Sequence, residues 1–373
     1  MNYDNLKKLE YVYIADREAS LLFHSLFIES YKKIFTEFDL TEAGKYYTDN
    51  TALVAHGMVV SMYRNKTSMA KAALLMKDKF TKNQKHLENL YNIALTKAEE
   101  TDKKIIKINN EIESNNSDFL KVYSKLRQLF VDYFGIQVFP LLIERAFAQL
   151  TDNNELGSLE PILVLWREKT HGVQNRLETV FEKFLNVVGK KIKADPKYYS
   201  ATEIYEMLNG LSKVDDSIIN QRKEMYLMIW NWDNGIPYSV FTDDGSLNFA
   251  RFLEKKCKDT SDNKIFKGRS INKGIVTGKV YIISKKKDFR SIPPDTIIVA
   301  KIVELDDFAY LPNSNIAGVV TEEGGITSHI AIRGRELGVP IITGARGIMS
   351  SIKTGDLVEV DADEGVVRIL KKK

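Results

Sequence analysis

The sequence predicts two domains: a mainly helical domain over residues 1–260, then an α/β domain over residues 261–373. Three observations predict this class. A length of 373 residues is typical of two domains. Up to about residue 260, apolar side chains recur mostly at helical spacing. From Gly268 onward, short β-rich segments alternate with Gly, Pro and Asp turns, so the polar stretch Lys255–Gly268 is the expected hinge.

In the first domain, the spacing of apolar residues predicts a series of amphipathic helices. Ser200 and Gly210 suit the two caps of a short helix over Ala201–Leu208. Alternating residues over Asp49–Met62 predict a strand or a hairpin, and Asp233–Leu247 is expected to be a loop. The other expected helices are Thr67–Ile112 as one helix or a pair, Asp118–Leu150 with an interruption near Gly135 and Pro140, Glu160–Lys169, Val173–Lys193 and Asp216–Trp232.

The second domain contains a strand, a short helix and a second strand in succession. Ile316–Val320 and Val339–Ile342 are predicted to be buried strands because they are short apolar runs rich in β-branched residues. The helix between them is expected over about Ser328–Leu337. Gly338 suits the left-handed C-terminal cap, and Pro340 prevents the helix from continuing.

A histidine, His329, falls in the first turn of this expected helix, just after Gly324 and Gly325. Thr327 and Ser328 carry hydroxyl groups that suit a helix N-terminus. Unpaired backbone N–H groups at such a terminus favour a bound phosphoryl group. The same field disfavours imidazolium, so it keeps the ring neutral and nucleophilic near pH 7. The glycine pair leaves room for a bulky phosphate donor.

One face of this helix is expected to hold the phosphate and another to be buried. At 100° per residue, His329, Arg333 and Glu336 share one side. Arg333 is therefore expected to reach the same phosphate as His329, with Glu336 holding the arginine in place. The predicted buried stripe is Ile330, Gly334 and Leu337. Each feature alone has a commonplace alternative, because a lone histidine is usually structural or solvated and a glycine pair is usually a turn.

These residues and their flanking segments resemble the phosphohistidine, or swivelling, domain of the phosphoenolpyruvate-utilising enzymes. That family includes phosphoenolpyruvate synthase, pyruvate phosphate dikinase and the rifampicin phosphotransferases. The resemblance implies a β/β/α fold for residues 261–373 and a phosphorylated histidine at His329. Thr327 matches a threonine that is a regulatory phosphorylation site in some relatives, and Arg335 matches the arginine before Glu-Leu-Gly. The other similar segments are Gly274–Val280, Asp295–Ala300, Ala317–Glu322, Gly355–Asp361 and Gly365–Val367.

A weaker resemblance concerns the first domain. Lys197–Ile204 and Ile218–Arg222 are similar to the segment that precedes the histidine domain in rifampicin phosphotransferase-like proteins. This resemblance implies that residues 1–260 correspond to the acceptor-binding module of such proteins.

No segment of the sequence is suited to loading the histidine. Gly274–Lys279 has the wrong spacing for a phosphate-binding loop and is followed by a strand. The chain also lacks an ATP-grasp pattern and the alternating series of a phosphoenolpyruvate-binding barrel. We therefore expect a separate ATP-grasp subunit, similar to the nucleotide-binding part of pyruvate phosphate dikinase, to be the donor. ATP and Mg²⁺ are expected on that partner, with no cofactor or metal in this chain.

The sequence thus predicts a phosphotransferase component in which His329 takes a phosphoryl group from the partner, or from phosphoenolpyruvate, and passes it to a small-molecule acceptor. Gly324, Gly325, Thr327 and Ser328 are expected to bind the phosphate, with Arg333 or Arg335 as a clamp. The main alternative is a regulatory or scaffold protein that keeps the fold without catalysis. A self-sufficient kinase is a third hypothesis.

Composition bears on three further properties: nucleic-acid binding, disulfide bonds and membrane association. A net charge of +4 with intermixed signs gives no case for nucleic-acid binding. The single cysteine, Cys257, excludes a disulfide framework and is interpreted as structural. The N-terminus lacks an apolar signal core and no run of 18 apolar residues occurs, so we expect a cytoplasmic protein without a membrane segment. Trp166, Trp230 and Trp232 are expected in the core, and Asp361–Gly365 in a hairpin turn.

Overall fold

The computed structural model describes residues 3–82, 84–113, 118–150, 156–233, 235–258, 264–284, 286–303, 311, 315–325, 328, 330–331 and 334–373. The chain forms two compact units, Met1–Cys257 and Lys258–Lys373. The division falls between residues 257 and 258, where the sequence placed it between 260 and 261. Of the expected hinge, Lys255–Lys258 belongs to a helix, and residues 259–263 lie outside the described residues.

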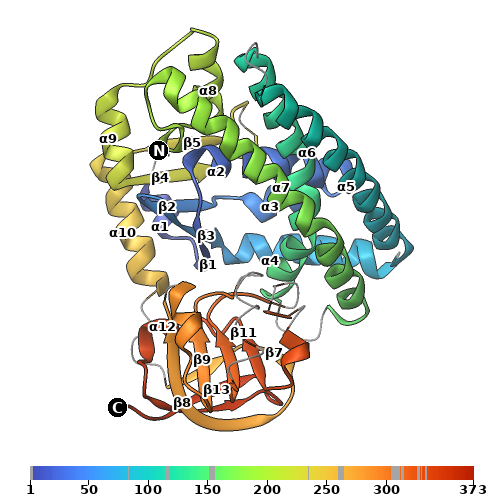
Figure 1. Ribbon diagram of the computed structural model, residues 1–373, viewed down its shortest axis with the longest axis vertical. Helices are drawn as coiled ribbons and strands as arrows, with labels where there is room; N and C mark the ends of the chain where they lie inside the picture. Colours follow the sequence, from blue (N-terminus) through green and yellow to red (C-terminus); the bar gives the residue numbers. More distant parts are fainter. Residues whose placement is uncertain are drawn as a thin grey trace. The chain divides into compact units, whose positions relative to one another are not determined.

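The N-terminal unit is mainly helical, as expected, but it also contains a five-stranded antiparallel sheet, of which only the Asp49–Met62 region was predicted (Figure 1). In spatial order the strands are β1 (Tyr11–Glu18), β3 (Val59–Asn65), β2 (Ala52–His56), β4 (Met225–Trp230) and β5 (Tyr238–Phe241). The helices are α1 (Tyr3–Lys7), α2 (Leu21–Glu37), α3 (Thr41–Thr48), α4 (Lys66–Lys82), α5 (Gln84–Glu113), α6 (Phe119–Phe147), α7 (Glu160–Ile192), α8 (Ala201–Leu208), α9 (Asp216–Glu224) and α10 (Asp244–Lys258), with 3₁₀ turns η1 (Gly157–Leu159) and η2 (Pro196–Tyr198).

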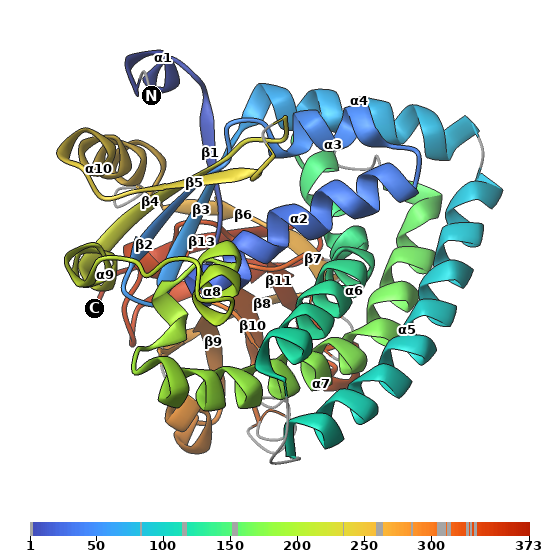
Figure 2. The same cartoon turned by 90° about the horizontal axis from the view of Figure 1, so that it is seen from above.

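The two faces of this sheet are covered differently. Side chains of α1 and α10 pack on one face, where Leu6, Phe249 and Leu253 join buried residues of the strands. Helices α2 and α3 contribute aromatic rings to the other face, where Tyr31 meets Trp230 edge to face. The long helices α5, α6 and α7 pack side by side beyond them (Figure 2).

Several local predictions for this unit are confirmed. Thr67–Ile112 is a pair of helices, α4 and α5, and Asp49–Met62 contains the strand β2 and the start of its hairpin partner β3. Helix α8 begins at a capping box in which Ser200 and Glu203 each bond the other's backbone N–H. All three tryptophans are buried.

Helix α6 continues through Gly135 and Pro140, so the expected interruption is wrong. Proline has no N–H to donate to the carbonyl of Ile136 four residues earlier. The indole Nε1 of Trp166 donates to that carbonyl instead, at 2.9 Å. A Cβ on Gly135 would lie 2.7 Å from the carbonyl oxygen of Ser30, so the glycine permits close packing of α2 on α6. Contacts with α7 and α2 therefore allow α6 to continue through Pro140 and Gly135.

Three other expectations for the first unit are also corrected. The two helices predicted within Glu160–Lys193 are one helix, α7. The helix predicted over Asp216–Trp232 ends at Glu224, and the six residues that follow form the fully buried strand β4. The expected loop Asp233–Leu247 contains β5 and the start of α10.

Within the described residues, α6 is the one helix long and apolar enough, by length and composition, to cross a membrane. In this structure 72% of its apolar stretch is buried. Burial of this kind is typical of a core helix.

His24 makes the stability of the N-terminal unit depend on pH. The ring is 1% exposed, and burial lowers its pKa to about 4. An unfolded chain binds a proton at this residue below about pH 6.5. The folded chain does not, so we expect stability to be lost as pH falls from 6.5 to 4, by roughly 3 kcal/mol in total.

The measurement is urea unfolding followed by tryptophan fluorescence, because all three tryptophans lie in this unit. His24→Leu should remove most of the pH dependence. Phe27→Leu, a change in the ring that contacts His24, should retain it. An equal pH dependence in His24→Leu and wild type would contradict the assignment.

The C-terminal unit is built on an eight-stranded sheet. In spatial order the strands are β6 (Ile265–Lys267), β13 (Val366–Lys371), β12 (Leu357–Asp361), β8 (Ile275–Ile283), β9 (Thr296–Ala300), β10 (Gly318–Thr321), β11 (Ile341–Thr343) and β7 (Arg269–Asn272). The four strands from β8 to β11 are parallel to their neighbours in that group, and the other pairs are antiparallel. The β-rich segments expected from the sequence, and the turn Asp361–Gly365 between β12 and β13, are confirmed.

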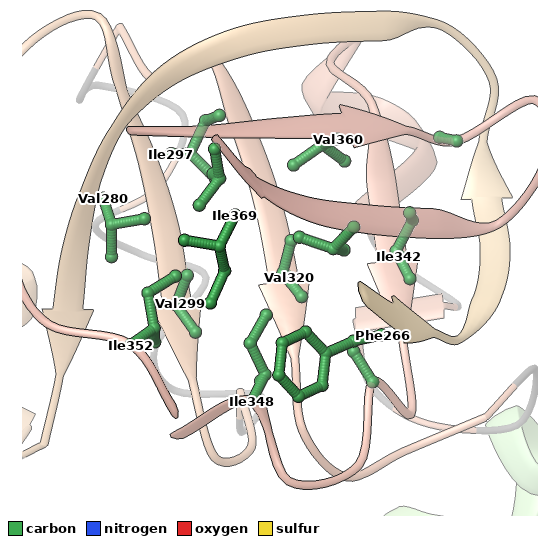
Figure 3. Packing of buried hydrophobic residues seen from close by; sticks show 14 residues of the cluster. Phe266, Val280, Ile297, Val299, Val320, Ile342, Ile348, Ile352, Val360 and Ile369 are labelled. Atoms are coloured by element: carbon green, nitrogen blue, oxygen red, sulfur yellow. The ribbon is translucent and has the colours of Figure 1, made fainter. Parts of the chain in front are cut away.

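This sheet closes on itself. β6 and β7 lie at the two ends of the strand order, yet only Gly268 separates them in the chain. Side chains from seven of the strands and from α12 (Ile348–Ser351) fill the enclosed core, as Figure 3 shows for Val299, Val320 and Ile342. Alternate residues of β9, β10 and β11, such as Ile298 and Val319, point to a second apolar cluster on the outer face.

Closure of the sheet requires glycine at position 268. A Cβ there would lie 2.5 Å from Cγ2 of Ile342 and 2.7 Å from the carbonyl oxygen of Thr343. Gly268→Ala is therefore expected to destabilise the unit by about 1–3 kcal/mol, as overpacking of a core does. Faster hydrogen exchange in β6, β7 and β11 would report the loss. The matched control is Gly235→Ala, where a Cβ meets no atom within 4 Å, and an equal effect in both variants would contradict the steric argument.

Candidate functional site

The candidate site lies where β10 ends. β9, β10 and β11 are parallel, so their carboxyl ends meet at one edge of the sheet. The chain leaves β10 at Thr321 and enters the loop Glu322–Gly325 at that edge. In α/β proteins, both open sheets and closed barrels commonly bind ligands outside the carboxyl ends of their parallel strands. The topology therefore places the glycine pair in a favourable position for a ligand.

Two buried threonines shape the start of this loop. The hydroxyl of Thr321 donates to the Oγ1 of Thr343 on the neighbouring strand β11, at 2.9 Å. Gly324 sits against the same oxygen, and a Cβ on it would lie only 2.4 Å from Thr343 Oγ1. Its φ of +118° is also rare for residues with a side chain. Glycine is thus required at position 324 by both space and backbone conformation.

Two glutamates anchor the loop to the sheet. The backbone N–H groups of Glu322 and Glu323 donate to the carbonyl oxygens of Ala300 and Lys301, at 2.9 and 2.8 Å. The carboxylate of Glu322 accepts from the N–H of Met349 in α12, at 2.8 Å. The side chain of Glu323 is buried, with the Lys301 ammonium 3.9 Å from Oε1. These contacts fix the position from which the glycine pair begins.

Ser328 and Gly325 form a tight turn. The hydroxyl and the N–H of Ser328 both donate to the carbonyl oxygen of Gly325, at 2.6 and 3.1 Å. The N–H of Ala331 donates to the carbonyl oxygen of Ser328, at 3.0 Å, which begins the helical turn. Within the described part of the chain, the N–H groups of Gly324 and Gly325 donate to no acceptor. Gly324 is exposed and Gly325 is buried, and both N–H groups are candidate donors to an anion at this loop.

The helix after the turn differs from the one expected. Ile330 and Ala331 are helical, but Gly334–Leu337 is a 3₁₀ turn (η5). The prediction of one α-helix over about Ser328–Leu337 is therefore wrong for the last turn. A Cβ on Gly334 would lie 2.7 Å from Cδ1 of Ile341, and the carbonyl of Gly334 accepts from Asn272 of β7. Tight packing against β11 and β7 accompanies the tighter turn. The predicted buried stripe is confirmed, since Ile330 and Gly334 are buried and Leu337 is half-buried.

The structure thus brings three of the expected site residues, Gly324, Gly325 and Ser328, into one turn. Arg335 is exposed in η5 and forms no hydrogen bond with those three. His329, Thr327 and Arg333 lie outside the described residues, so their roles remain predictions. Thr343 and the two anchoring glutamates were not assigned from the sequence. Their sequence signal was weak: Thr343 is the last residue of one buried strand, and the two glutamates follow another.

Metal ligands are not grouped in the described residues, where no three His, Cys, Asp or Glu side chains converge on one position. Cys257 is half-buried, and its thiol donates weakly to the carbonyl of Tyr11 at 3.5 Å. Burial raises the pKa of this thiol, which agrees with a structural role.

Comparison with known proteins assigns part of the C-terminal unit to a family. Residues 292–365 match the family model described as "PEP-utilising enzyme, mobile domain". The C-terminal unit therefore contains a mobile domain of the phosphoenolpyruvate-utilising enzymes.

Curated relatives match part of the chain. A probable phosphoenolpyruvate synthase of Archaeoglobus fulgidus is 35% identical over 123 residues, which cover 32% of this chain and 16% of the relative. The rifampicin phosphotransferase of Bacillus cereus is 26% identical over 177 residues, or 47% of this chain and 19% of the relative. The chain is thus distantly homologous to both enzymes and spans less than a fifth of the length of either.

Among solved structures, aconitase X of Thermococcus kodakaraensis in its holo-form aligns with 29% of this chain over its own full length. The identity is 23% and the TM-score is 0.24, values too low to support an inference.

Proposed function

We propose that this protein is the phosphoryl-carrier component of a phosphotransferase, with His329 as the residue that carries the group. The observation that carries the proposal is that the loop Glu322–Gly325 lies within residues 292–365. These residues match the mobile-domain family and include His329. This loop presents two backbone N–H donors at the carboxyl ends of parallel strands, immediately before the histidine. Donors fixed in this way stabilise phosphoryl transfer without reorganisation.

The proposed reaction has two displacements at phosphorus. A ring nitrogen of His329 attacks the phosphoryl group, a P–N bond forms and the P–O bond to the donor breaks, with the electron pair leaving on the donor oxygen. An acceptor hydroxyl or carboxylate oxygen then attacks the same phosphorus, the P–N bond breaks and the ring regains its neutral form. A hydroxyl acceptor releases its proton to solvent or to a base. No redox change occurs.

The residues around the loop have distinct proposed roles. The N–H groups of Gly324 and Gly325 bind phosphate oxygens, and Thr327 supports them. Ser328 holds the turn, because its hydroxyl hydrogen is engaged with Gly325. Arg333 or the exposed Arg335 neutralises the phosphate charge in the complex with the donor or acceptor.

The donor is proposed to be a separate ATP-grasp subunit that holds ATP and Mg²⁺, in the cytoplasm, with phosphoenolpyruvate as the alternative donor. The unit Met1–Cys257 is proposed to hold the small-molecule acceptor. Splitting donor and carrier between two chains is feasible because phosphoryl transfer depends mainly on positioning.

The test is a labelling experiment on the full chain. It is incubated with ATP labelled at the β or the γ position, with and without an ATP-grasp protein of the pyruvate phosphate dikinase type from the same organism, and separately with labelled phosphoenolpyruvate. The expected product is an acid-labile, base-stable phosphoprotein that forms from ATP only when the partner is present. Label from ATP alone would indicate a self-sufficient kinase. Absence of acid-labile label from every donor would overturn the proposal and favour a regulatory or scaffold protein.

A further inference from the structure

Arg64 is a buried cation in the N-terminal unit. It lies on β3, its side chain is fully buried, and it forms no ion pair within the described part of the chain. Its Nη1 donates to the carbonyl oxygen of Tyr47 at 3.3 Å, whereas Nε and Nη2 are buried and have no partner among the described residues. An arginine keeps its proton under all ordinary conditions, so this charge is present in the folded protein.

Three aromatic rings enclose the guanidinium group. Its central carbon lies 4.0 Å from the ring centre of Tyr47, 5.6 Å from that of Trp230 and 5.7 Å from that of Tyr31. Cation–π contacts of this kind offset part of the desolvation of the charge. They leave the two unpaired nitrogen atoms unsatisfied, because each still has N–H groups to donate.

Two of the enclosing rings carry unpaired polar atoms of their own. The hydroxyl of Tyr47 and the indole Nε1 of Trp230 are both buried, and neither has a hydrogen-bond partner in the part of the chain that the structure describes. The indole N–H is a donor only, and the phenol is able to donate. Orphaned donors from a strand, a helix and a second strand thus gather around one cation. Native structures rarely leave such groups unsatisfied, and each needs an explanation.

Two further arginines extend the positive charge outward. Arg145 on α6 and Arg17 on β1 are half-buried, whereas Arg64 is fully buried, and the three lie near enough for the charges of Arg17 and Arg64 to act on Arg145. Burial lowers the pKa of Arg145 to about 10, and the charges of Arg17 and Arg64 add to this effect. Arg17 itself donates to the carbonyl of Asp16 at 2.9 Å. The acidic side chain that acts on Tyr47 in this region is the buried Glu144.

A buried charge is unfavourable unless it is paired. We infer that the arginine cluster, Arg64 with Arg145 and Arg17, binds the carboxylate or phosphate group of a small molecule, with Tyr47 and Trp230 donating to its oxygen atoms. The planar guanidinium fork matches both oxyanions, and entry is from the half-buried end at Arg17 and Arg145. This inference does not depend on phosphoryl transfer at His329.

The test compares thermal unfolding of the full chain in sodium phosphate, sodium acetate and sodium chloride at equal ionic strength, followed by tryptophan fluorescence. For wild type, we expect phosphate or acetate to raise the melting temperature by several degrees, saturably, above chloride. The larger of the two responses identifies the oxyanion. Equal responses to all three salts would overturn the inference, because buried water would then satisfy the donors.

The variants separate a binding role from a structural one. Arg64→Met should lose the response to the oxyanion, yet unfold at an equal or higher temperature than wild type in its absence, because an unpaired charge has been removed. Arg251→Met, at an exposed arginine of α10, should respond as wild type does. Retention of the full oxyanion response in Arg64→Met would also overturn the inference. If that variant does not fold, Arg145→Met at the outer end of the cluster gives the same comparison.

Discussion

His329→Ala is expected to abolish acid-labile phosphorylation of this chain. A phosphoryl group on an imidazole nitrogen is held by a P–N bond, which hydrolyses in acid and survives base. Phosphoesters of serine or threonine behave in the opposite way in acid, so Thr327 or Ser328 cannot replace the lost label. The measurement is the acid-labile fraction of label after incubation with the donor system. The loss should be complete, because the variant has no atom that forms the covalent intermediate.

The matched control is His56→Ala. His56 is a half-exposed histidine on β2 that pairs with Glu254, and it lies in the other unit. This variant should keep the full acid-labile label. If His329→Ala and wild type carry equal amounts of acid-labile label, His329 is not the residue that carries the phosphoryl group. Loss of label in both variants would show that the loss results from misfolding, and not from the absence of the histidine that forms the phosphorylated intermediate.

Gly324→Ala should slow phosphoryl acceptance by about a hundredfold, the typical effect of displacing a reacting group by about 1 Å. The added Cβ would collide with Thr343 Oγ1 and would have to adopt a φ of +118°. The loop then moves from its place beside β11, and its two N–H donors no longer point to the phosphate. Rapid-quench measurement of label formation on the full chain gives the rate.

A second glycine of the same unit serves as the control. Gly338 has a φ of +67°, and a Cβ on it would meet no atom within 4 Å. Gly338→Ala therefore introduces a comparable backbone strain, but away from the loop, so it should lower stability and leave the rate almost unchanged. In Gly324→Ala/Thr343→Ala the collision is relieved, and part of the rate should return. Similar rates for both single variants would argue against a role for the loop geometry.

The candidate loop was predictable in part because its determinants are local. Gly324, Gly325 and Ser328 lie within five consecutive positions, and glycine and serine favour turns whatever surrounds them. Thr343 was not predictable, because its contact with Gly324 depends on the parallel pairing of β10 with β11. Such pairing is set by packing of the whole sheet and has no signature in either segment alone.

Strands of the N-terminal sheet were also difficult to predict from local sequence. β4 is buried at every position, so it lacks the alternation that identifies a strand exposed on one side, and its apolar run continues the amphipathic pattern of α9. Pro140 is a helix breaker in sequence, but its effect depends on Trp166, which supplies the missing hydrogen bond from another helix. Both errors arise where a distant segment, and not local propensity, decides the structure.

Because β6 pairs with β13, the first strand of the C-terminal unit finds its partner about a hundred residues later in the chain. Such long-range contacts slow folding, since a large loop must be ordered before the pairing stabilises it. During synthesis, the opening strand must therefore wait until Val366–Lys371 has emerged from the ribosome. Completion of the C-terminal unit therefore depends on β13, and a chain without this strand would leave β6 without its pairing partner.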